Sequence, residues 1–202
     1  MIFTHHGRAA IRQAVIGGRK YKVVLVGGRL WLAENLDYKF SGCTIAATGS
    51  PTTPAAWYYD NNEASYGVDG TYRCGLLYNW YAVNYLETNK AVLCPGWHVA
   101  TTMEWSALVS AAGSATELKA VDNAVVAGWP TSWNGTDTAR FGVLPCGRYD
   151  GSFGLLGTDG RYWTANSYSS SAAYDRRFTS GSSVGENTNQ KTVGYSVRLV
   201  KD

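Results

Sequence analysis

The sequence carries little charge. Charged residues make up 16% of the 202-residue chain, against roughly 25% in an average soluble protein. No apolar run approaches the roughly 20 residues that a membrane-spanning helix needs, so a transmembrane chain is excluded. Disordered chains and coiled coils are excluded too, because both need more charge and fewer aromatics than the 13% found here. The length predicts one large domain, or one domain with an N-terminal appendage.

Basic clusters are also missing. The net charge is only +3 and no block of Lys or Arg occurs, so neither nucleic acid nor a membrane surface is indicated as a partner. The first residues lack the apolar segment of a secretory signal. We therefore expect a chain that is used without such export, or one that begins after a removed signal.

Residues for catalysis or metal binding are sparse. None of the four cysteines forms a CxxC pair, so zinc is disfavoured, and two disulfides or four reduced thiols both remain open. They are Cys43, Cys74, Cys94 and Cys146. Of the three histidines only His98 is expected in the fold, and we interpret it as packing or hydrogen-bonding at a turn before a helix rather than as a triad member. The acidic residues Asp69, Asp137, Asp150 and Asp159 are isolated, and no nucleotide-binding or nucleophile motif is present. We predict no enzyme, cofactor or metal site.

The N-terminal part predicts an arm followed by a hairpin. Residues 1–20 are weakly patterned and are interpreted as an arm or tether, so the domain is expected over 21–202. Residues 21–26 have the character of a strand, Gly27-Gly28 of a turn, and residues 30–36 of the partner strand. Residues 41–56 are rich in small and polar residues and predict a loop.

Two helices are predicted from periodicity. The first follows the apolar stripe of Leu77, Trp80, Tyr81 and Tyr85. The second follows Thr101, which with Glu104 forms a capping box, and a glycine at position 113 is placed to end it. After about residue 125 short segments dominate, ending in an alternating strand at 195–201. This order predicts an α+β domain.

The aromatic residues divide into core and surface. Trp31, Trp80, Trp97 and Trp105 lie on patterned elements and are predicted to be core. In residues 164–193, by contrast, Ser, Thr, Asn and Tyr supply 16 of 30 residues, a composition that cannot bury an apolar face. It fits a solvated strand face or loop, or a binding surface in which Tyr gives rigid contact area and Ser and Asn give adaptable hydrogen bonds. Strongly patterned segments lie on either side of residues 164–193, and such a rigid frame favours the interpretation as a binding surface.

Seven segments in order resemble one known family, the Fibrobacter succinogenes major paralogous domain. They are residues 26–36 (VGGRLWLAENL), 75–83 (GLLYNWYAV), 94–105 (CPGWHVATTMEW), 118–120 (LKA), 141–148 (FGVLPCGR), 162–165 (YWTA) and 194–202 (GYSVRLVKD). The resemblance covers about residues 20–202. It implies a C-type lectin-like fold, with two helices, a small mixed or antiparallel sheet and long loops, in the branch shared with formylglycine-generating enzymes.

The resemblance also implies a function. The family supplies variable proteins of diversity-generating retroelements, often phage receptor-binding or bacterial surface proteins, in which adenine-directed mutation diversifies codons such as AAC in a C-terminal region. Residues 164–193 fall where that region would lie, and most of their residue types are reachable from AAC. Glu186, Gln190 and Lys191 are not reachable that way and are expected to be fixed.

The chain departs from the family in several places. Leu199 stands where the last strand often has a cysteine, which removes a disulfide partner for Cys94 and favours a reduced protein assembled inside the cell. No active-site cysteine pair of the enzyme branch can be mapped, and a formylglycine-generating type of enzyme is the third-ranked interpretation. The calcium-binding triplets of sugar-binding C-type lectins are absent.

These points predict a non-enzymatic binding protein that is diversified by a retroelement. It is expected on a phage tail, with a cell-surface protein or glycan receptor as its partner. Residues 1–20 would attach it to a tail fibre or mediate self-association. The alternative is a fixed-sequence bacterial surface adhesin or carbohydrate-binding module of the same family. The expected ligand contacts are Asn166, Tyr168, Ser169, Ser171, Tyr174, Asp175, Arg177, Thr179, Ser182, Asn187 and Asn189.

Overall fold

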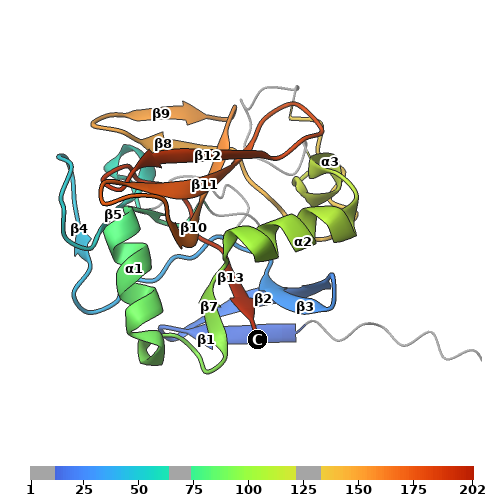
Figure 1. Cartoon of the computed structure of the whole chain (residues 1–202), viewed down its shortest axis with the longest axis horizontal. Coiled ribbons are helices and arrows are strands. Elements are labelled where there is room, and N and C mark those ends of the chain that lie inside the picture. The colour runs from blue at the N-terminus through green and yellow to red at the C-terminus, as the bar shows by residue number, and fades with distance from the viewer. Residues whose placement is uncertain (1–11, 64–73, 122–132) are drawn as a thin grey trace, which may run out of the picture.

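The computed structural model describes residues 12–63, 74–121 and 133–202. Within these ranges the chain forms thirteen strands, three α-helices and two short 3-10 helices. The strands form two five-stranded sheets and one three-stranded sheet. Figure 1 shows the two larger sheets one above the other, with the helices packed beside and between them.

The first sheet has the order β1-β2-β3-β13-β7. Its strands are β1 (Arg12–Ile16), β2 (Arg19–Val26), β3 (Arg29–Leu32), β7 (Trp97–Val99) and β13 (Leu199–Lys201). Gly27 and Gly28, with φ of 59° and 79°, form the predicted turn between β2 and β3. Only left-handed backbone closes such a two-residue hairpin turn with the right twist, which is why glycines stand there.

The second sheet has the order β12-β11-β10-β8-β9. Its strands are β8 (Cys146–Tyr149), β9 (Phe153–Leu156), β10 (Gly160–Ser167), β11 (Ala172–Phe178) and β12 (Gly185–Gln190). The small sheet contains β4 (Thr44–Ile45), β5 (Ala55–Trp57) and β6 (Leu77–Tyr78). The segment 41–56, predicted as a loop, therefore includes two short strands. Strands of two and three residues carry no readable alternation, and this explains the miss.

The helices are α1 (Trp80–Thr88), α2 (Thr102–Ala112) and α3 (Ala115–Leu118), and the 3-10 helices are η1 (Tyr59–Asn61) and η2 (Lys90–Val92). Both predicted helices are present. Helix α2 has the predicted capping box and ends at Gly113, with φ of 94°. Helix α1 begins after Asn79, whose side chain caps it, and buries Trp80, Val83 and Leu86. The predicted stripe was partly wrong, because Leu77 lies in β6 and Tyr81 and Tyr85 are only half-buried.

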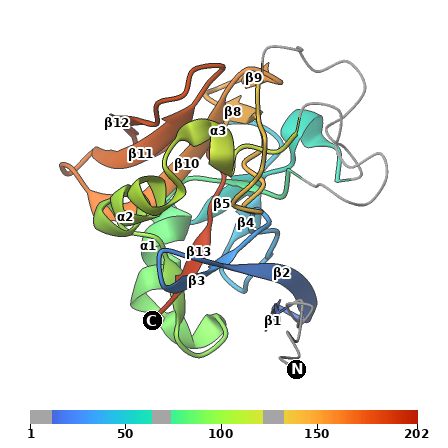
Figure 2. The ribbon, with the colours of Figure 1, turned by 90° about the vertical axis from the view of Figure 1, so that its right-hand side faces the viewer.

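Two apolar clusters form most of the core. One joins α1 to the first sheet and to β10 and β11 of the second sheet, and the other surrounds α2. The predicted core tryptophans are confirmed: Trp31, Trp80, Trp97 and Trp105 are at most 6% exposed. Figure 2 shows α1 and α2 beside the strands of both large sheets, and each helix contacts both sheets. The helices thus fix the second sheet relative to the first.

The predicted fold class was wrong. The expectation was an α+β, C-type lectin-like layout of two helices and one small sheet, in the formylglycine-generating-enzyme branch. The described residues instead form a β-rich fold of thirteen strands in three sheets, with helices of only 9, 11 and 4 residues. The two helices dominated the sequence reading because their periodicity is strong, whereas most strands are too short to show one.

The segment predicted as an arm is partly built into the first sheet. Arg12–Ile16 pairs antiparallel with β2, which itself begins at Arg19. Residues 1–11 lie outside the described residues. None of the helices in the described ranges is long and apolar enough to cross a membrane.

Candidate binding surface

The segment 164–193, predicted as a display region, forms the end of β10, the whole of β11 and β12, and their connections. Strand β11 pairs antiparallel with β10 on one side and with β12 on the other. Strand β12 is the edge of its sheet, and most of its side chains are exposed or half-buried. We call residues 164–193 the display segment. In Figure 1 its strands lie along the upper part of the molecule, above α2.

The display segment has an exposed turn at one end. Ser169 and Ser171 are exposed, and Tyr168 is 61% exposed. The ring of Tyr168 packs edge-on against that of Tyr174, with centroids 5.4 Å apart. Such a pair gives rigid apolar contact area beside small hydroxyl groups, and this combination suits a binding surface.

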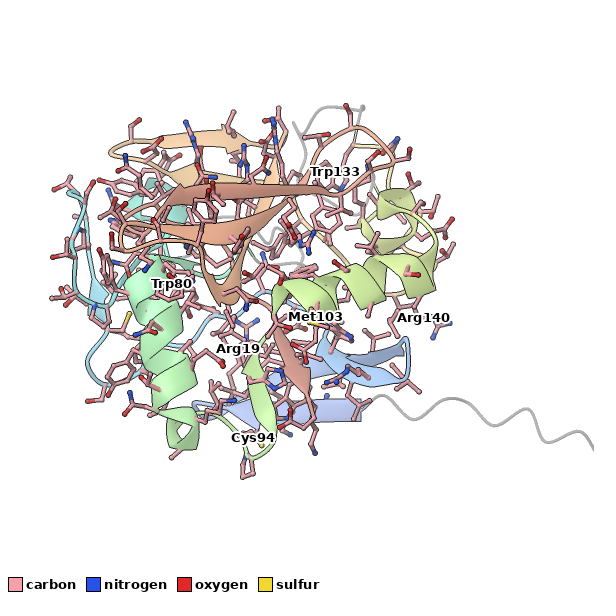
Figure 3. The ribbon with its side chains drawn as sticks, viewed as in Figure 1. Arg19, Trp80, Cys94, Met103, Trp133 and Arg140 are labelled. Atoms are coloured by element: carbon pink, nitrogen blue, oxygen red, sulfur yellow. A yellow bond between two sulfur atoms is a disulfide. The ribbon has the colours of Figure 1, made fainter. Side chains whose placement is uncertain are left out.

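Lys191 and Trp80 support that turn through hydrogen bonds to the backbone of the display segment. The Lys191 ammonium donates to the carbonyl oxygen of Ser169 at 2.8 Å and lies 4.3 Å from the centroid of the Trp80 ring. The Trp80 indole N–H donates to the carbonyl oxygen of Thr164 at 3.0 Å. Figure 3 shows Trp80 at the end of α1 that lies nearest these strands. The exposed turn therefore rests on a fixed support.

Arg176 ties β11 to α2, and sequence reasoning missed it. Its Nη2 donates to the carbonyl oxygen of Thr102 at 2.6 Å and to the Ser106 hydroxyl at 2.9 Å. It also forms an ion pair of 2.7 Å with Glu186 on β12. Burial lowers the pKa of Arg176 against the opposing influence of Glu186. The Arg176-Arg177 pair in a polar segment was the only sequence signal, and it does not say which arginine turns inward.

Asn166 has a structural contact as well. Its side-chain oxygen accepts a hydrogen bond of 2.8 Å from the backbone N–H of Thr102, in the first turn of α2. That N–H is one of the helix-end donors without an intrahelical partner. Asn166 therefore helps to cap α2, and its amide oxygen is already engaged.

The other face of β11 carries a buried network of paired charges. Asp175 is fully buried and accepts from Arg161 at 3.3 Å and from Asn189 at 2.6 Å. Arg161 also donates to Asp159 at 3.2 Å, and Arg177 donates to Asp159 at 2.8 Å. Burial raises the pKa of Asp175, while the bonds from Asn189 and Arg161 act to lower it. These side chains cross-link β10, β11 and β12.

The predicted contact residues therefore divide into three groups. Exposed are Tyr168, Ser169, Ser171 and Ser182; half-buried are Asn166, Tyr174, Arg177, Thr179, Asn187 and Asn189; buried is Asp175. The structure brings Tyr168 and Tyr174 together at the turn. Arg177 and Thr179 lie at the far end of β11, so the candidates form one strip rather than one cluster.

A small polar pocket lies at that far end. It measures about 240 Å³ and is lined by Trp133, Gly157, Thr158, Asp159, Arg177, Thr179 and Ser180. Two of these seven, Arg177 and Thr179, are predicted contact residues. We call it the polar pocket. Figure 3 labels Trp133, beyond the ends of the strands and close to α3.

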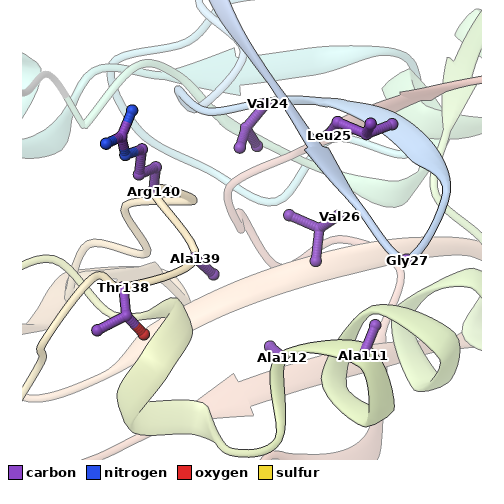
Figure 4. Close-up of a pocket in the computed structure, with 9 residues that line it drawn as sticks. All are labelled: Val24, Leu25, Val26, Gly27, Ala111, Ala112, Thr138, Ala139 and Arg140. Carbon is purple, nitrogen blue, oxygen red and sulfur yellow. The ribbon is translucent and has the colours of Figure 1, made fainter. Parts of the chain in front are cut away.

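A second hollow lies on a different face. Figure 4 shows it between the β2–β3 hairpin, the end of α2 and the segment 138–140. Its lining is Val24, Leu25, Val26, Gly27, Ala111, Ala112, Thr138, Ala139 and Arg140. None of these residues belongs to the display segment, and no predicted contact residue lies there.

His98 has the structural role predicted for it. Its Nε2 lies 2.9 Å from Glu104 Oε1, and its Nδ1 lies 3.2 Å from Asp202 Oδ1. The hydrogen bond to Glu104 raises the pKa of His98. Burial opposes ionisation of Glu104, but bonds from His98 and Thr101 outweigh it and lower the Glu104 pKa to about 2. Among the described residues no group of three or more His, Cys, Asp or Glu could hold a metal ion.

One disulfide is present. Cys74 and Cys146 are bonded, and Cys43 and Cys94 are free. The expectation of a fully reduced protein was wrong for the first pair. The bond joins the segment before β6 to the start of β8, and Asn35 donates to the Cys74 carbonyl oxygen at 2.9 Å. Sequence spacing does not encode this pairing, since four cysteines allow three connectivities.

Comparison with known proteins gives a family. A model described as the Fibrobacter succinogenes major domain matches residues 24–201. Neither the curated proteins nor the solved structures contain a match to the chain. The matched range holds both large sheets except β1 and the first residues of β2, and it includes the display segment. The chain belongs to the Fibrobacter succinogenes major domain family.

Proposed function

We propose that this chain is a non-enzymatic binding protein whose ligand surface is the solvent-facing side of the display segment. We further propose that it is a variable protein of a diversity-generating retroelement, carried on a phage tail, with a cell-surface protein or glycan as receptor. The observation that carries the proposal is that the side chains of residues 164–193 divide into exposed ones and ones bonded to the rest of the chain. Exposed Tyr and Ser side chains lie in the turns that connect β10, β11 and β12, and inward side chains of these strands are held by internal bonds.

Two of the three residues that adenine-directed mutation cannot generate from AAC fit this division, whereas the third, Gln190, is exposed on β12. Glu186 pairs with Arg176, and Lys191 supports the turn at Ser169. Both are framework contacts that a diversified surface would need to keep. For these two, the residue type and the structural contact point the same way.

Internal bonds also reduce the number of positions in the display segment that can vary freely. Asn166, Asp175, Arg177 and Asn189 all use side-chain atoms in bonds to other parts of the chain. A change at one of these positions costs stability as well as altering the surface. The Ser169 hydroxyl accepts from the backbone N–H of Ala172 at 3.0 Å, and Asn187 interacts with Asp175. We therefore place the freely variable positions at Tyr168, Ser171, Tyr174, Thr179 and Ser182.

The disulfide supports a site of action outside the cytoplasm, because disulfides persist on virion and cell surfaces. This agrees with a phage tail and equally with the surface of a bacterium. A fixed bacterial adhesin is the second candidate, and the number of internally bonded side chains in the display segment favours it.

Two libraries displayed on yeast test the proposal. In the first, Tyr168, Ser171 and Ser182 are replaced by the residue types reachable from AAC, and the library is sorted against several unrelated purified proteins. In the matched control library the same diversity is placed at Asp175 and Asn189. We expect most members of the first library to stay folded and some to bind a target, and most of the control library to lose folded display. Folded members without any binder, or equal folding in both libraries, would refute the proposed surface.

A further inference from the structure

The polar pocket joins the display segment to a part of the chain that lies outside it. Arg177, Thr179 and Ser180 come from the display segment, whereas Gly157, Thr158 and Asp159 come from the turn between β9 and β10. A ligand in this pocket would touch one wall that can vary and one that does not. We propose that the polar pocket binds a single sugar ring of a receptor glycan. This inference rests on the proposed binding function and names its ligand class.

The charges around the pocket favour a neutral ligand. Asp159 is paired with Arg177 at 2.8 Å and with Arg161 at 3.2 Å, and Arg161 also reaches Asp175 at 3.3 Å. Two carboxylates thus compensate two guanidinium groups. The Lys119 ammonium also lies close by, where it donates to the carbonyl oxygens of Thr179 and Gly181 at 2.9 and 3.0 Å. Asp159 is only 5% exposed and the more exposed Arg177 is already paired with it, so an ion gains less here than beside an unpaired charge.

The polar groups match the chemistry of sugar hydroxyls. Thr158, Thr179 and Ser180 carry hydroxyls, which donate and accept, while Asp159 accepts and Arg177 donates. Neighbouring hydroxyls of a sugar also donate and accept, so they can bond to both members of an acid–arginine pair. The Arg177 side chain is 42% exposed, which places a donor within reach of a ligand.

The size of the pocket and its aromatic lining residue agree with one sugar ring. The volume of about 240 Å³ corresponds to about eight waters at ~30 Å³ each, which suits a sugar ring and is below the range of larger ligands. Trp133 is 2% exposed and lines the pocket, and its indole Nε1 is buried with no hydrogen-bond partner among the described residues. Trp133 is therefore an aromatic part of the pocket wall, and its buried Nε1 is not open to a ligand.

The test is a titration followed by NMR on the full chain labelled with ¹⁵N. The probes are the methyl glycosides of glucose, mannose, galactose and N-acetylglucosamine, each raised to about 100 mM because a ligand of about a dozen atoms binds at millimolar concentrations. At least one glycoside is expected to shift the amide resonances of residues 157–159 and 177–180 in a saturable way. Thr179→Val and Arg177→Met are each expected to weaken that binding at least about tenfold, the effect of one lost polar contact. Ser171→Ala, at the other end of the display segment, is the matched control and should leave it unchanged.

Two results would overturn the proposal. One is that no glycoside shifts the pocket resonances, and the other is that sodium phosphate shifts them as strongly as any glycoside. Binders from the yeast library with no glycoside binding would remove only the sugar inference. Glycoside binding without library binders would instead remove the diversified surface and leave a fixed carbohydrate-binding module.

Discussion

Replacing Asp175 with alanine tests whether this residue belongs to the framework rather than to the ligand surface. Sequence composition placed it among the contact residues, but its side chain is fully buried and bonded to Arg161 and Asn189. The change removes the acceptor for both donors. It leaves the volume of a carboxylate unfilled between β10 and β12, without touching any exposed group.

The expected cost follows from the partners that remain. Removing one member of a buried charged pair costs about 3–5 kcal/mol, because the other charge is left uncompensated. Arg161 keeps its bond of 3.2 Å to Asp159, so the lower end, about 3 kcal/mol, applies. In a chain of this size 1 kcal/mol shifts the melting temperature by about 2–4 °C, which gives a fall of roughly 6–12 °C. Asp175→Asn keeps an oxygen for Asn189 and should cost about half as much.

Thermal unfolding followed by circular dichroism provides the measurement, with urea titration as a second assay of the free energy of unfolding. Ser171→Ala, on the exposed turn of the same segment, is the control and should change the free energy by less than about 0.5 kcal/mol. The double variant D175A/N189A should be less destabilised than the sum of the two single variants, because their side chains are bonded to each other. A melting temperature of Asp175→Ala within about 2 °C of the wild type would show that the network contributes little, and the framework argument would then fail.

Three further predictions concern the frame. Because Glu104 has a pKa of about 2 when folded and 4.5 ordinarily, its share of stability is present above pH 4.5 and is lost as the pH falls towards 2. His98 has a raised pKa, so its contribution to stability is full below pH 6.5 and is lost as the pH rises through the higher pKa of the folded state. Urea unfolding at a series of pH values should show both slopes in the free energy of unfolding, and Glu104→Gln should weaken both. Unchanged slopes in that variant would contradict the pairing. The denatured chain should show two reactive thiols before reduction and four after it, and closing a loop of 72 residues predicts that reduction costs about 4 kcal/mol; four thiols before reduction would disprove the bond. Gly147 has φ of 67°, and an added Cβ would lie 2.3 Å from the carbonyl oxygen of Gly154, whereas Gly151 has φ of 75° and open space. Gly147→Ala should therefore prevent folding or cost well over the ~1–2 kcal/mol expected for Gly151→Ala, and equal melting temperatures would refute the steric argument.

Sequence reasoning was most successful where a pattern is local. The capping box of Thr101 and Glu104, and the turn at Gly27 and Gly28, depend only on residues a few positions apart, and both are present. The same turn motif, Gly17-Gly18, joins β1 to β2. The repeated Gly-Gly turn could have predicted β1, but residues 1–20 were interpreted as an arm.

Long-range partners could not be read in this way. Asp175 and Arg161 look like surface charges in the sequence, and only the register of β10 and β11 brings them together in the interior. Lys191 likewise gains its role from Trp80 on a helix more than 100 residues earlier. The composition of residues 164–193 set them apart from the rest of the chain, but it could not separate the inward from the outward side chains. Strand register decides that, and register depends on contacts across the whole sheet.

Deep sequencing of the encoding locus across a growing population tests the central claim most directly. The account predicts substitutions confined to adenine positions in the codons for residues 164–193, beside a reverse transcriptase gene and a template repeat. It also predicts that they concentrate at outward positions such as Tyr168, Ser171 and Ser182, while Glu186, Gln190 and Lys191 stay constant. A uniform sequence with no template repeat would contradict diversification and leave a fixed surface adhesin as the better account.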